Sequence, residues 1–333
     1  MDEEKRGEET KDGRRRSTTR SKREGGKGQG KGATTKKRKT CIALEALLPE
    51  EEGHENMNIE QKKEEEKVKN QPYSGDWSAS SWNGQGLLAS EAMKQHSKMR
   101  RARELSRAHD ITGLQETHGR TGKMEAVRAI PGTRMFWSNG AEGEAGVGLW
   151  IKQAFIDRVC GPGNVGEFIE VEKGRGAIWR GGGKDGKFQI SVVYLHTGNS
   201  VGTRERQRTL QKVMDEMAKY GTAMSILLGD FNFVTNLEDR MGGEEKKFTG
   251  GSDNAEAKQW QEMLKKMNME ELEQHQYTYR FEETRSRIDW IYTIIRPFEK
   301  LDRDIGCVAL DWKDHLSGIG LWLDLKGHPS QRM

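Results

Sequence analysis

The chain has 333 residues and a formal net charge of +4, but the charge is unevenly distributed. Residues 1–40 carry 15 Lys and Arg against 7 Asp and Glu, and residues 41–70 carry 4 against 9. Subtracting both segments from the totals of 56 and 52 leaves 37 basic and 36 acidic residues in 71–333. The first 70 residues have too few apolar side chains to offset the entropy of ordering, so we expect a disordered charged tail followed by one folded domain, 71–333.

Several classes of protein are excluded by simple features. No apolar run approaches 18 residues, which excludes a membrane-spanning helix, and the charged N-terminus excludes a secretory signal. The cysteines, Cys41, Cys160 and Cys307, lack metal-ligand spacing and indicate a reducing compartment. Basic clusters at residues 14–16 and 36–39 predict nuclear import or nucleic-acid contact, with a solvated tail of no specific role as the alternative. We therefore expect a nuclear protein, or otherwise a cytoplasmic one, that is not secreted.

Strand and helix patterns alternate along residues 71–333 without an internal repeat. Apolar or β-branched runs that indicate strands occur at residues 78–82, 110–115, 147–152, 187–194, 223–228, 288–294 and 319–325. Helical patterns occur at residues 91–108, 206–220 and 256–269, and their Met and Trp stripes are interpreted as core. Strands outnumber helices, and several neighbouring strands have no helix between them. This favours a mixed-sheet α/β sandwich over a doubly wound parallel sheet.

The motif Gly229-Asp230-Phe231-Asn232 directly follows the apolar run at residues 226–228. Side chains at positions i and i+2 of an extended segment point the same way, so Asp230 and Asn232 are predicted to aim at one spot where a strand ends. Taken alone, the motif is equally consistent with a turn.

Five other polar clusters stand at the start or end of a predicted strand. They are Asn83 with Gly84 and Gly86, Glu116 within Leu114-Gln115-Glu116-Thr117-His118, Tyr194 with His196, Arg287 with Asp289, and Asp314 with His315. Carboxylates on strand ends suit a hard cation such as Mg²⁺, and Tyr or His side chains can donate to phosphate oxygens. Each cluster alone has an ordinary alternative: a turn, a surface Glu, a packed Tyr, a surface ion pair or a loop His.

In their order along the chain, these clusters resemble the endonuclease/exonuclease/phosphatase superfamily, the fold of DNase I, exonuclease III-type abasic-site endonucleases and LINE-type retrotransposon endonucleases. The resemblance runs from about residue 77 to residue 325. The sequence motif around Glu116 is most similar to that of the retrotransposon and abasic-site branch. It implies a four-layer α/β sandwich, with two mixed β-sheets packed face to face and flanked by helices. It also implies phosphoester hydrolysis with Mg²⁺, or alternatively Mn²⁺, at one edge of the sandwich.

The resemblance also implies a role for each matching residue. Glu116 and Asp314 correspond to metal ligands, and Asn83 helps to hold the metal or the phosphate. The catalytic residues implied are Asp230 to orient or deprotonate water, Asn232 to fix its placement and contact the scissile phosphate, His315 to donate to a phosphate oxygen, Asp289 to orient His315, and Tyr194 to hydrogen-bond the phosphate.

Two positions depart from the family's pattern. Lys313 stands where a small Ser usually precedes the Asp-His pair, and is expected to modulate activity without abolishing it. His196 stands where the family often has Pro, in a loop that borders the substrate, so substrate specificity is the property most affected. Four residues are expected to contact the substrate phosphate or nucleic acid: His196, Asn199, Arg287 and Lys313.

These features support three functional hypotheses. The first is a monomeric Mg²⁺-dependent DNA endonuclease of the LINE or abasic-site type, because the basic tail suits a polyanionic partner. The second is another enzyme of the same fold, such as a phosphoinositide phosphatase or an RNA 3′ exonuclease. The third is a non-catalytic nucleic-acid-binding remnant of a retroelement, which is disfavoured because the ionisable positions of the family's site are filled.

Overall fold

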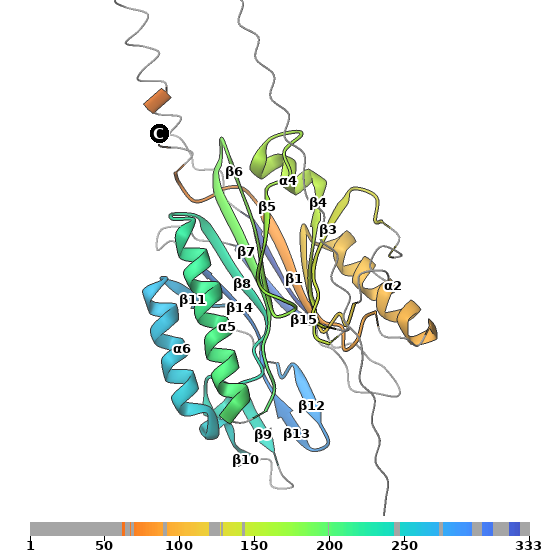
Figure 1. The fold of residues 1–333 in the computed structure, drawn as a ribbon, viewed down its shortest axis with the longest axis vertical. Coiled ribbons are helices and arrows are strands. Elements are labelled where there is room, and N and C mark those ends of the chain that lie inside the picture. Colours follow the sequence, from red (N-terminus) through yellow and green to blue (C-terminus); the bar gives the residue numbers. More distant parts are fainter. Residues whose placement is uncertain are drawn as a thin grey trace, which may run out of the picture. The chain divides into compact units, whose positions relative to one another are not determined.

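The computed structural model describes residues 62–63, 67, 70–88, 92–119, 127, 129–141, 144–198, 200–242, 247–272, 276–294, 302–308 and 320–326. Two six-stranded sheets dominate it (Figure 1). Strand order in the first sheet is β15 (Asp302–Val308), β16 (Gly320–Lys326), β1 (Trp77–Asn83), β2 (Ile111–Gln115), β4 (Val147–Lys152) and β3 (Thr133–Ser138). Strand order in the second sheet is β11 (Met269–Glu271), β14 (Asp289–Ile294), β8 (Met224–Asp230), β7 (Gly186–Tyr194), β6 (Gly176–Gly183) and β5 (Glu167–Glu172).

Each large sheet is mixed, with one parallel pair among antiparallel neighbours. The parallel pair is β1 with β2 in the first sheet and β7 with β8 in the second. A smaller, four-stranded sheet lies beside them, in the order β10 (Lys247–Phe248), β9 (Arg240–Gly242), β13 (Thr284–Ser286) and β12 (Tyr279–Phe281). Its strands all belong to the chain between β8 and β14, so it lies close to the end of β8 and the start of β14.

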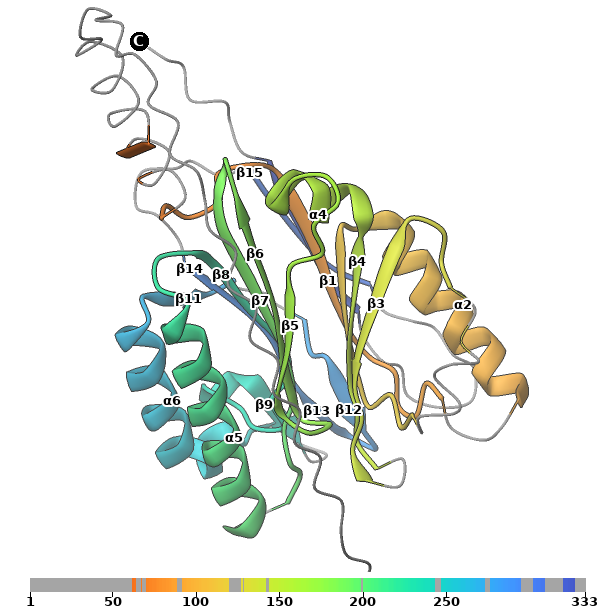
Figure 2. The same ribbon diagram turned by 45° about the horizontal axis from the view of Figure 1, so that its top comes forward.

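The layers run helix, sheet, sheet, helix (Figure 2). Helix α2 (Ala92–Ala108) covers the outer face of the first sheet, and α5 (Ser200–Lys219) and α6 (Asn254–Lys266) cover that of the second. The short helix α4 (Gln153–Cys160) follows β4 and packs Phe155, Ile156 and Val159 into the core between the sheets. The four-layer α/β sandwich expected from the sequence is therefore confirmed.

The central strands are apolar at consecutive positions because both of their faces are buried. In β7, Phe188, Ile190 and Val192 enter the core between the sheets, whereas Val193 enters the core under α5 and α6. Strand β8 alternates in the same way between those two cores. Burial on two faces produces a continuous apolar run instead of strict alternation, which is the pattern seen in residues 223–228.

Every strand and helix predicted from the sequence is present, with shifted ends. The helix predicted at residues 256–269 ends at Lys266, and residue 269 opens β11. The elements without a clear sequence pattern are β3, α4, β5, β6, β15 and the short strands. Strand β6 contains four glycines, which are depleted in strands, so local propensity argues against it. Among the helices of the described residues, none combines the length and apolarity needed to cross a membrane.

Candidate functional site

The ends of five strands bring polar side chains to one edge of the sandwich. Strands β1 and β2 run parallel with Asn83 beside Gln115, so Asn83 and Glu116 leave the first sheet together. In the second sheet Asp230 pairs with Tyr194 of β7 on one side and with Asp289 of β14 on the other. Pairing within each sheet therefore gathers these groups, and the packing of the two sheets brings both sets together.

Asn83 joins the two sheets through its side-chain amide. Its Nδ2 donates to Oε1 of Glu116 at 2.9 Å and to Oδ2 of Asp230 at 2.8 Å. Its Oδ1 accepts the backbone N–H of Gln85 at 2.9 Å, which fixes the orientation of the amide. In this arrangement Asn83 holds two carboxylates together as a donor, while its oxygen accepts one backbone N–H.

Glu116 sits at a turn directly after β2. Its φ is 50°, an uncommon value for a residue other than glycine, and its carbonyl accepts the backbone N–H of Gly86 at 2.7 Å. The loops after β1 and β2 are thus hydrogen-bonded to each other, which fixes Glu116 beside Asn83. Nε2 of His118 lies 3.9 Å from Oε2 of Glu116, and sequence reasoning gave His118 no role of its own.

The Gly-Asp-x-Asn motif has a different geometry from the one expected. Strand β8 ends at Asp230, and Asn232 has a φ of 54°, so the two residues do not form one extended segment. The backbone N–H of Asn232 donates to Oδ1 of Asp230 at 3.0 Å, and its Nδ2 donates to the carbonyl of Leu195 at 2.8 Å. The prediction that both side chains aim at one spot because the chain is extended is wrong. Asn232 instead orients Asp230 through its backbone.

Burial and neighbouring negative charge dominate the electrostatics of the site. Asp230 is 2 % exposed, and its burial, reinforced by the charge of Glu116, raises its pKa to about 7. Hydrogen bonds from Asn232 and Asn83 oppose this rise. Burial, Asp230 and Glu116 also raise the pKa of Asp289 well above its ordinary value, against hydrogen bonding from Thr278. A carboxyl group that titrates near neutral pH is suited to accept a proton from water.

Tyr194 completes this group at the end of β7. Burial and the charges of Glu116 and Asp230 raise the pKa of its phenol, and it is hydrogen-bonded to Glu116. The phenol therefore stays protonated and can donate a hydrogen bond. The guanidinium of Arg175 lies 4.6 Å from the centre of its ring. Among the described residues Arg175 takes part in no ion pair with a carboxylate, so it brings positive charge to an acidic site.

Other predicted residues have different surroundings. The Nε of Arg287 donates to Oδ1 of Asp239 at 2.9 Å, and its guanidinium lies 4.5 Å from the ring centre of Trp290, so it is engaged in a structural ion pair. His196 is half-buried after β7, and burial together with Arg175 lowers its pKa. Four predicted residues lie outside the described part of the chain: Asn199, Lys313, Asp314 and His315.

Sequence reasoning did not find Arg175 or Thr278. Arg175 belongs to the turn between β5 and β6, within a Gly-flanked stretch that resembles any charged turn. The hydroxyl of Thr278 accepts the backbone N–H groups of Ile288 and Asp289 at 3.1 Å each, and so fixes the start of β14. A lone Thr in a loop carries no sequence signal for such a role.

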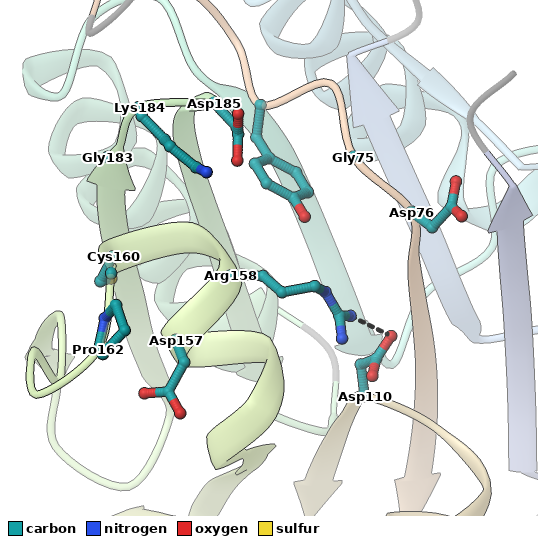
Figure 3. A pocket seen from close by; sticks show the side chains of 12 residues that line it. Gly75, Asp76, Asp110, Asp157, Arg158, Cys160, Pro162, Gly183, Lys184 and Asp185 are labelled. Atoms are coloured by element: carbon teal, nitrogen blue, oxygen red, sulfur yellow. Dashed lines mark ion pairs between the residues drawn. The ribbon is translucent and has the colours of Figure 1, made fainter. Parts of the chain in front are cut away.

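A cavity of about 1080 Å³ lies at the opposite end of the sandwich (Figure 3). Asp76 precedes β1, Asp110 precedes β2, and Lys184 and Asp185 form the turn between β6 and β7, so the cavity is where the parallel strands begin. An ion pair of 3.2 Å joins Arg158 to Asp110 in its wall. The cavity contains none of the clustered residues at the other edge, and we assign the chemistry to the cluster.

Comparison with known proteins identifies the family of the chain. A model of the endonuclease/exonuclease/phosphatase family matches residues 80–293, more than half of the chain, so the protein belongs to that family of phosphoester hydrolases. The family resemblance drawn from the sequence is confirmed. No curated protein sequence matches the chain.

Solved structures share the fold at low sequence identity. The endonuclease domain of TRAS1, a telomere-specific non-LTR retrotransposon, is similar with a TM-score of 0.50 and 13% identity, over 76% of this chain and 99% of that one. A humanized TDP2 of D. rerio has a TM-score of 0.51 and 15% identity, over 75% and 99%. The 3′ phosphatase NExo from Neisseria, bound to a product DNA hairpin, has a TM-score of 0.53 and 16% identity, over 75% and 99%.

Proposed function

We propose that the protein is a Mg²⁺-dependent phosphodiesterase, and specifically a DNA endonuclease that nicks its substrate by in-line attack of water. The observation that carries this proposal is the cluster in which Asn83 bridges Glu116 and Asp230, with Tyr194 and Asp289 on the neighbouring strands. The endonuclease domain and the DNA-bound 3′ phosphatase among the similar structures support DNA as the substrate.

Different residues of the protein would accept the proton, contact the phosphate and orient the donors. Asp230, with a pKa near 7, would accept the proton of the attacking water, and the backbone of Asn232 would hold its carboxylate in place. Tyr194 would donate its O–H to a non-bridging phosphate oxygen. His315 would donate to the same phosphate, with Asp289 fixing the orientation of its ring. Positioned donors and charge neutralisation are what phosphoryl transfer requires.

The residues that are present fit a divalent cation. Burial and the charge of neighbouring carboxylates raise the pKa values of Asp230 and Asp289, and a nearby cation would offset that repulsion. No group of three His, Cys, Asp or Glu arranged to hold a metal occurs within the described ranges, but Mg²⁺ keeps several waters and needs only one or two protein carboxylates. Glu116 would hold it together with Asp314, and the bound cation would neutralise charge on the scissile phosphate.

Nicking of supercoiled plasmid tests the proposal. Purified protein is expected to nick the plasmid in Mg²⁺ and to stop when EDTA is added. Glu116→Ala and Asp230→Ala should each lower the rate by about 100-fold or more, because each removes a charged group at the reacting centre. Asp110→Asn is the matched control, since Asp110 is a partly buried carboxyl at the other end of β2 and should leave nicking unchanged.

Thermal unfolding of each variant separates lost chemistry from lost structure. Wild-type protein that fails to nick in Mg²⁺, or folded Glu116 and Asp230 variants that nick like wild type, would refute the proposal. Plain, abasic and single-stranded DNA and RNA, compared in the same assay, identify the preferred substrate. Preference for RNA over every DNA substrate would exclude the DNA endonuclease and retain only the phosphodiesterase.

A further inference from the structure

Arg206 on α5 lies outside the cluster, and its guanidinium makes five hydrogen bonds. Only 5 % of it is exposed. Its Nε and Nη2 donate to the two carboxylate oxygens of Glu256 on α6 at 2.6 Å and 2.7 Å. Its Nη2 also donates to the hydroxyl of Thr203 at 2.9 Å. The guanidinium is therefore held in one orientation from the outer helices.

The remaining nitrogen of Arg206 holds the loop between β7 and α5. Nη1 donates to the carbonyls of His196 and Gly198, at 2.9 Å each. With these two bonds, all five N–H donors of a guanidinium are used. The loop is also packed closely on α5, because a Cβ at Gly202 would lie 2.2 Å from the carbonyl oxygen of Thr197.

This loop begins at a residue that orients the catalytic carboxylate. The carbonyl of Leu195 accepts Nδ2 of Asn232, and the backbone N–H of Leu195 donates to the carbonyl of Asp230 at 2.9 Å. A continuous set of hydrogen bonds thus runs from Glu256 through Arg206 and the loop to Asn232 and Asp230. Displacement of the loop would move the side-chain amide of Asn232, and with it the backbone N–H of Asn232 that donates to Asp230.

A buried ion pair is a costly way to join two helices, because apolar side chains of similar volume often hold them equally well or better. What an apolar pair cannot do is donate to two loop carbonyls. The loop is half-buried at His196 and exposed at Thr197 and Gly198, so without Arg206 its carbonyls could turn to water. The guanidinium ties them to α5 instead, which packing alone cannot do.

We propose that Arg206 is a positioning residue for phosphodiester hydrolysis: it fixes the His196–Gly198 loop and, through Leu195, the placement of Asn232 against Asp230. The inference rests on the proposed function for its catalytic consequence. Its structural part, the ordering of the loop by Arg206, can be measured without any reaction.

Arg206→Lys is the decisive variant. Lysine keeps a positive charge beside Glu256 but cannot donate to two loop carbonyls and a carboxylate in one fixed geometry. We expect kcat on a DNA oligonucleotide to fall by about 10- to 100-fold, because small misplacement of reacting groups has effects of this size, with KM changed less. We also expect faster amide hydrogen exchange at Leu195 and Asn232, whose backbone N–H groups donate to Asp230, measured in metal-free protein.

Two further variants complete the design. Arg180→Lys is the matched control, since Arg180 of β6 likewise pairs with carboxylates, with Glu167 of β5 at 2.8 Å and Glu216 of α5 at 3.5 Å. It should leave kcat and exchange at Leu195 and Asn232 unchanged. Arg206→Met combined with Glu256→Leu keeps α5 and α6 packed without a buried charge. It should reproduce the loss of kcat and the faster exchange even where Arg206→Lys folds poorly.

The outcomes separate this inference from the proposed function. Wild-type protein that hydrolyses no phosphodiester in Mg²⁺ overturns the proposed function. Active wild-type protein with folded Arg206 variants that keep normal kcat and normal exchange overturns the positioning role alone. Faster exchange with unchanged kcat also overturns it, because the loop would then be ordered by Arg206 without consequence for the reaction.

Discussion

The surroundings of Asp230 favour the neutral, protonated form of its carboxyl group when no metal is bound. Asp230 is buried beside Glu116 and Asp289, and its ionised form is favoured by hydrogen bonds from Asn232 and Asn83 and by the charge of Arg175. Such a group keeps its proton in the folded state at a pH where the unfolded chain has lost it. Ionisation of Asp230 in the folded protein therefore lowers the free energy of unfolding.

The raised pKa of Asp230 makes the free energy of unfolding fall as the pH rises. Because the folded pKa of Asp230, about 7, lies above its unfolded value, its favourable contribution is complete below about pH 4 and is lost as the pH rises through about 7. The free energy of unfolding in EDTA should fall by roughly 2 kcal/mol between pH 5 and pH 8. Urea unfolding at the two pH values measures it.

Asp230→Asn is the control for that measurement. Removing the titrating group should make the pH dependence between pH 5 and pH 8 shallower, with the remainder due to Asp289, whose pKa burial also raises. Mg²⁺ should restore stability to the wild-type protein at pH 8. Equal free energies of unfolding of the wild-type protein at both pH values in EDTA would show that ionising Asp230 does not destabilise the fold. The raised pKa would then be refuted.

At the residue scale, strand-end reasoning identified Asn83, Glu116, Tyr194, Asp230 and Asp289, and the structure brings these five together. It succeeded because a polar side chain after an apolar run marks the edge of a sheet whichever strands pair. The left-handed backbone of Asn232 and the position of Arg175 over a ring depend on tertiary contacts. No pattern within a few residues encodes such contacts.

At the scale of elements, Gly229 decides how β7 and β8 can approach each other at the site. Its φ is 145°, and a Cβ there would lie 2.0 Å from the carbonyl oxygen of Val193, its partner on β7. Only glycine permits both the backbone conformation and the close approach. The first residue of the Gly-Asp-x-Asn motif is thus required by strand pairing, whereas the second is the one that we propose for the reaction.

Gly229→Ala should therefore lower the free energy of unfolding by roughly 2–5 kcal/mol, through backbone strain together with a clash against β7. Gly221→Ala is the matched control. Gly221 has a φ of 74° but nothing within 4 Å of an added Cβ, so it should show only the smaller cost of strain, about 1 kcal/mol. Equal losses in both variants, measured by urea unfolding, would show that the clash has no effect.

Elements with a continuous apolar run or a one-sided helical stripe were predictable, and those held by their neighbours were not. Strand β6 is rich in glycine and is fixed by pairing with β5 and β7 on its two sides. Helix α4 is too short for a periodic pattern to stand out, and its three buried side chains are specified by the core between the sheets. For such elements the determining contacts are distant in sequence.

At the scale of the whole molecule, the candidate site exists only where the two sheets meet. Asn83 comes from the first sheet and Asp230 from the second, and they are 147 residues apart in sequence. The hydrogen bond between them requires both sheets to be complete and correctly packed. Partial unfolding of either sheet would separate the carboxylates, so we expect activity and the fold to be lost together.

The basic segment at residues 1–40 should act as an electrostatic aid to nucleic-acid binding. Its 15 basic residues against 7 acidic ones contrast with the near balance of 37 and 36 in residues 71–333. Each Lys or Arg that no longer neutralises a DNA phosphate makes the slope of log K against log salt concentration shallower by roughly 0.9. Deleting residues 1–40 should therefore weaken DNA binding at low salt and flatten its salt dependence, while the thermal unfolding midpoint stays the same.

Titration of a labelled DNA duplex at several salt concentrations measures both quantities. The control is the full-length chain with the basic residues of 14–16 and 36–39 changed to Gln, which keeps the length of the segment but removes seven positive charges. If charge is the cause, this variant should reproduce most of the effect of the deletion. A deletion that leaves affinity and slope unchanged would show that DNA binds only the nearly neutral domain, through the cationic groups at the edge of its sheets.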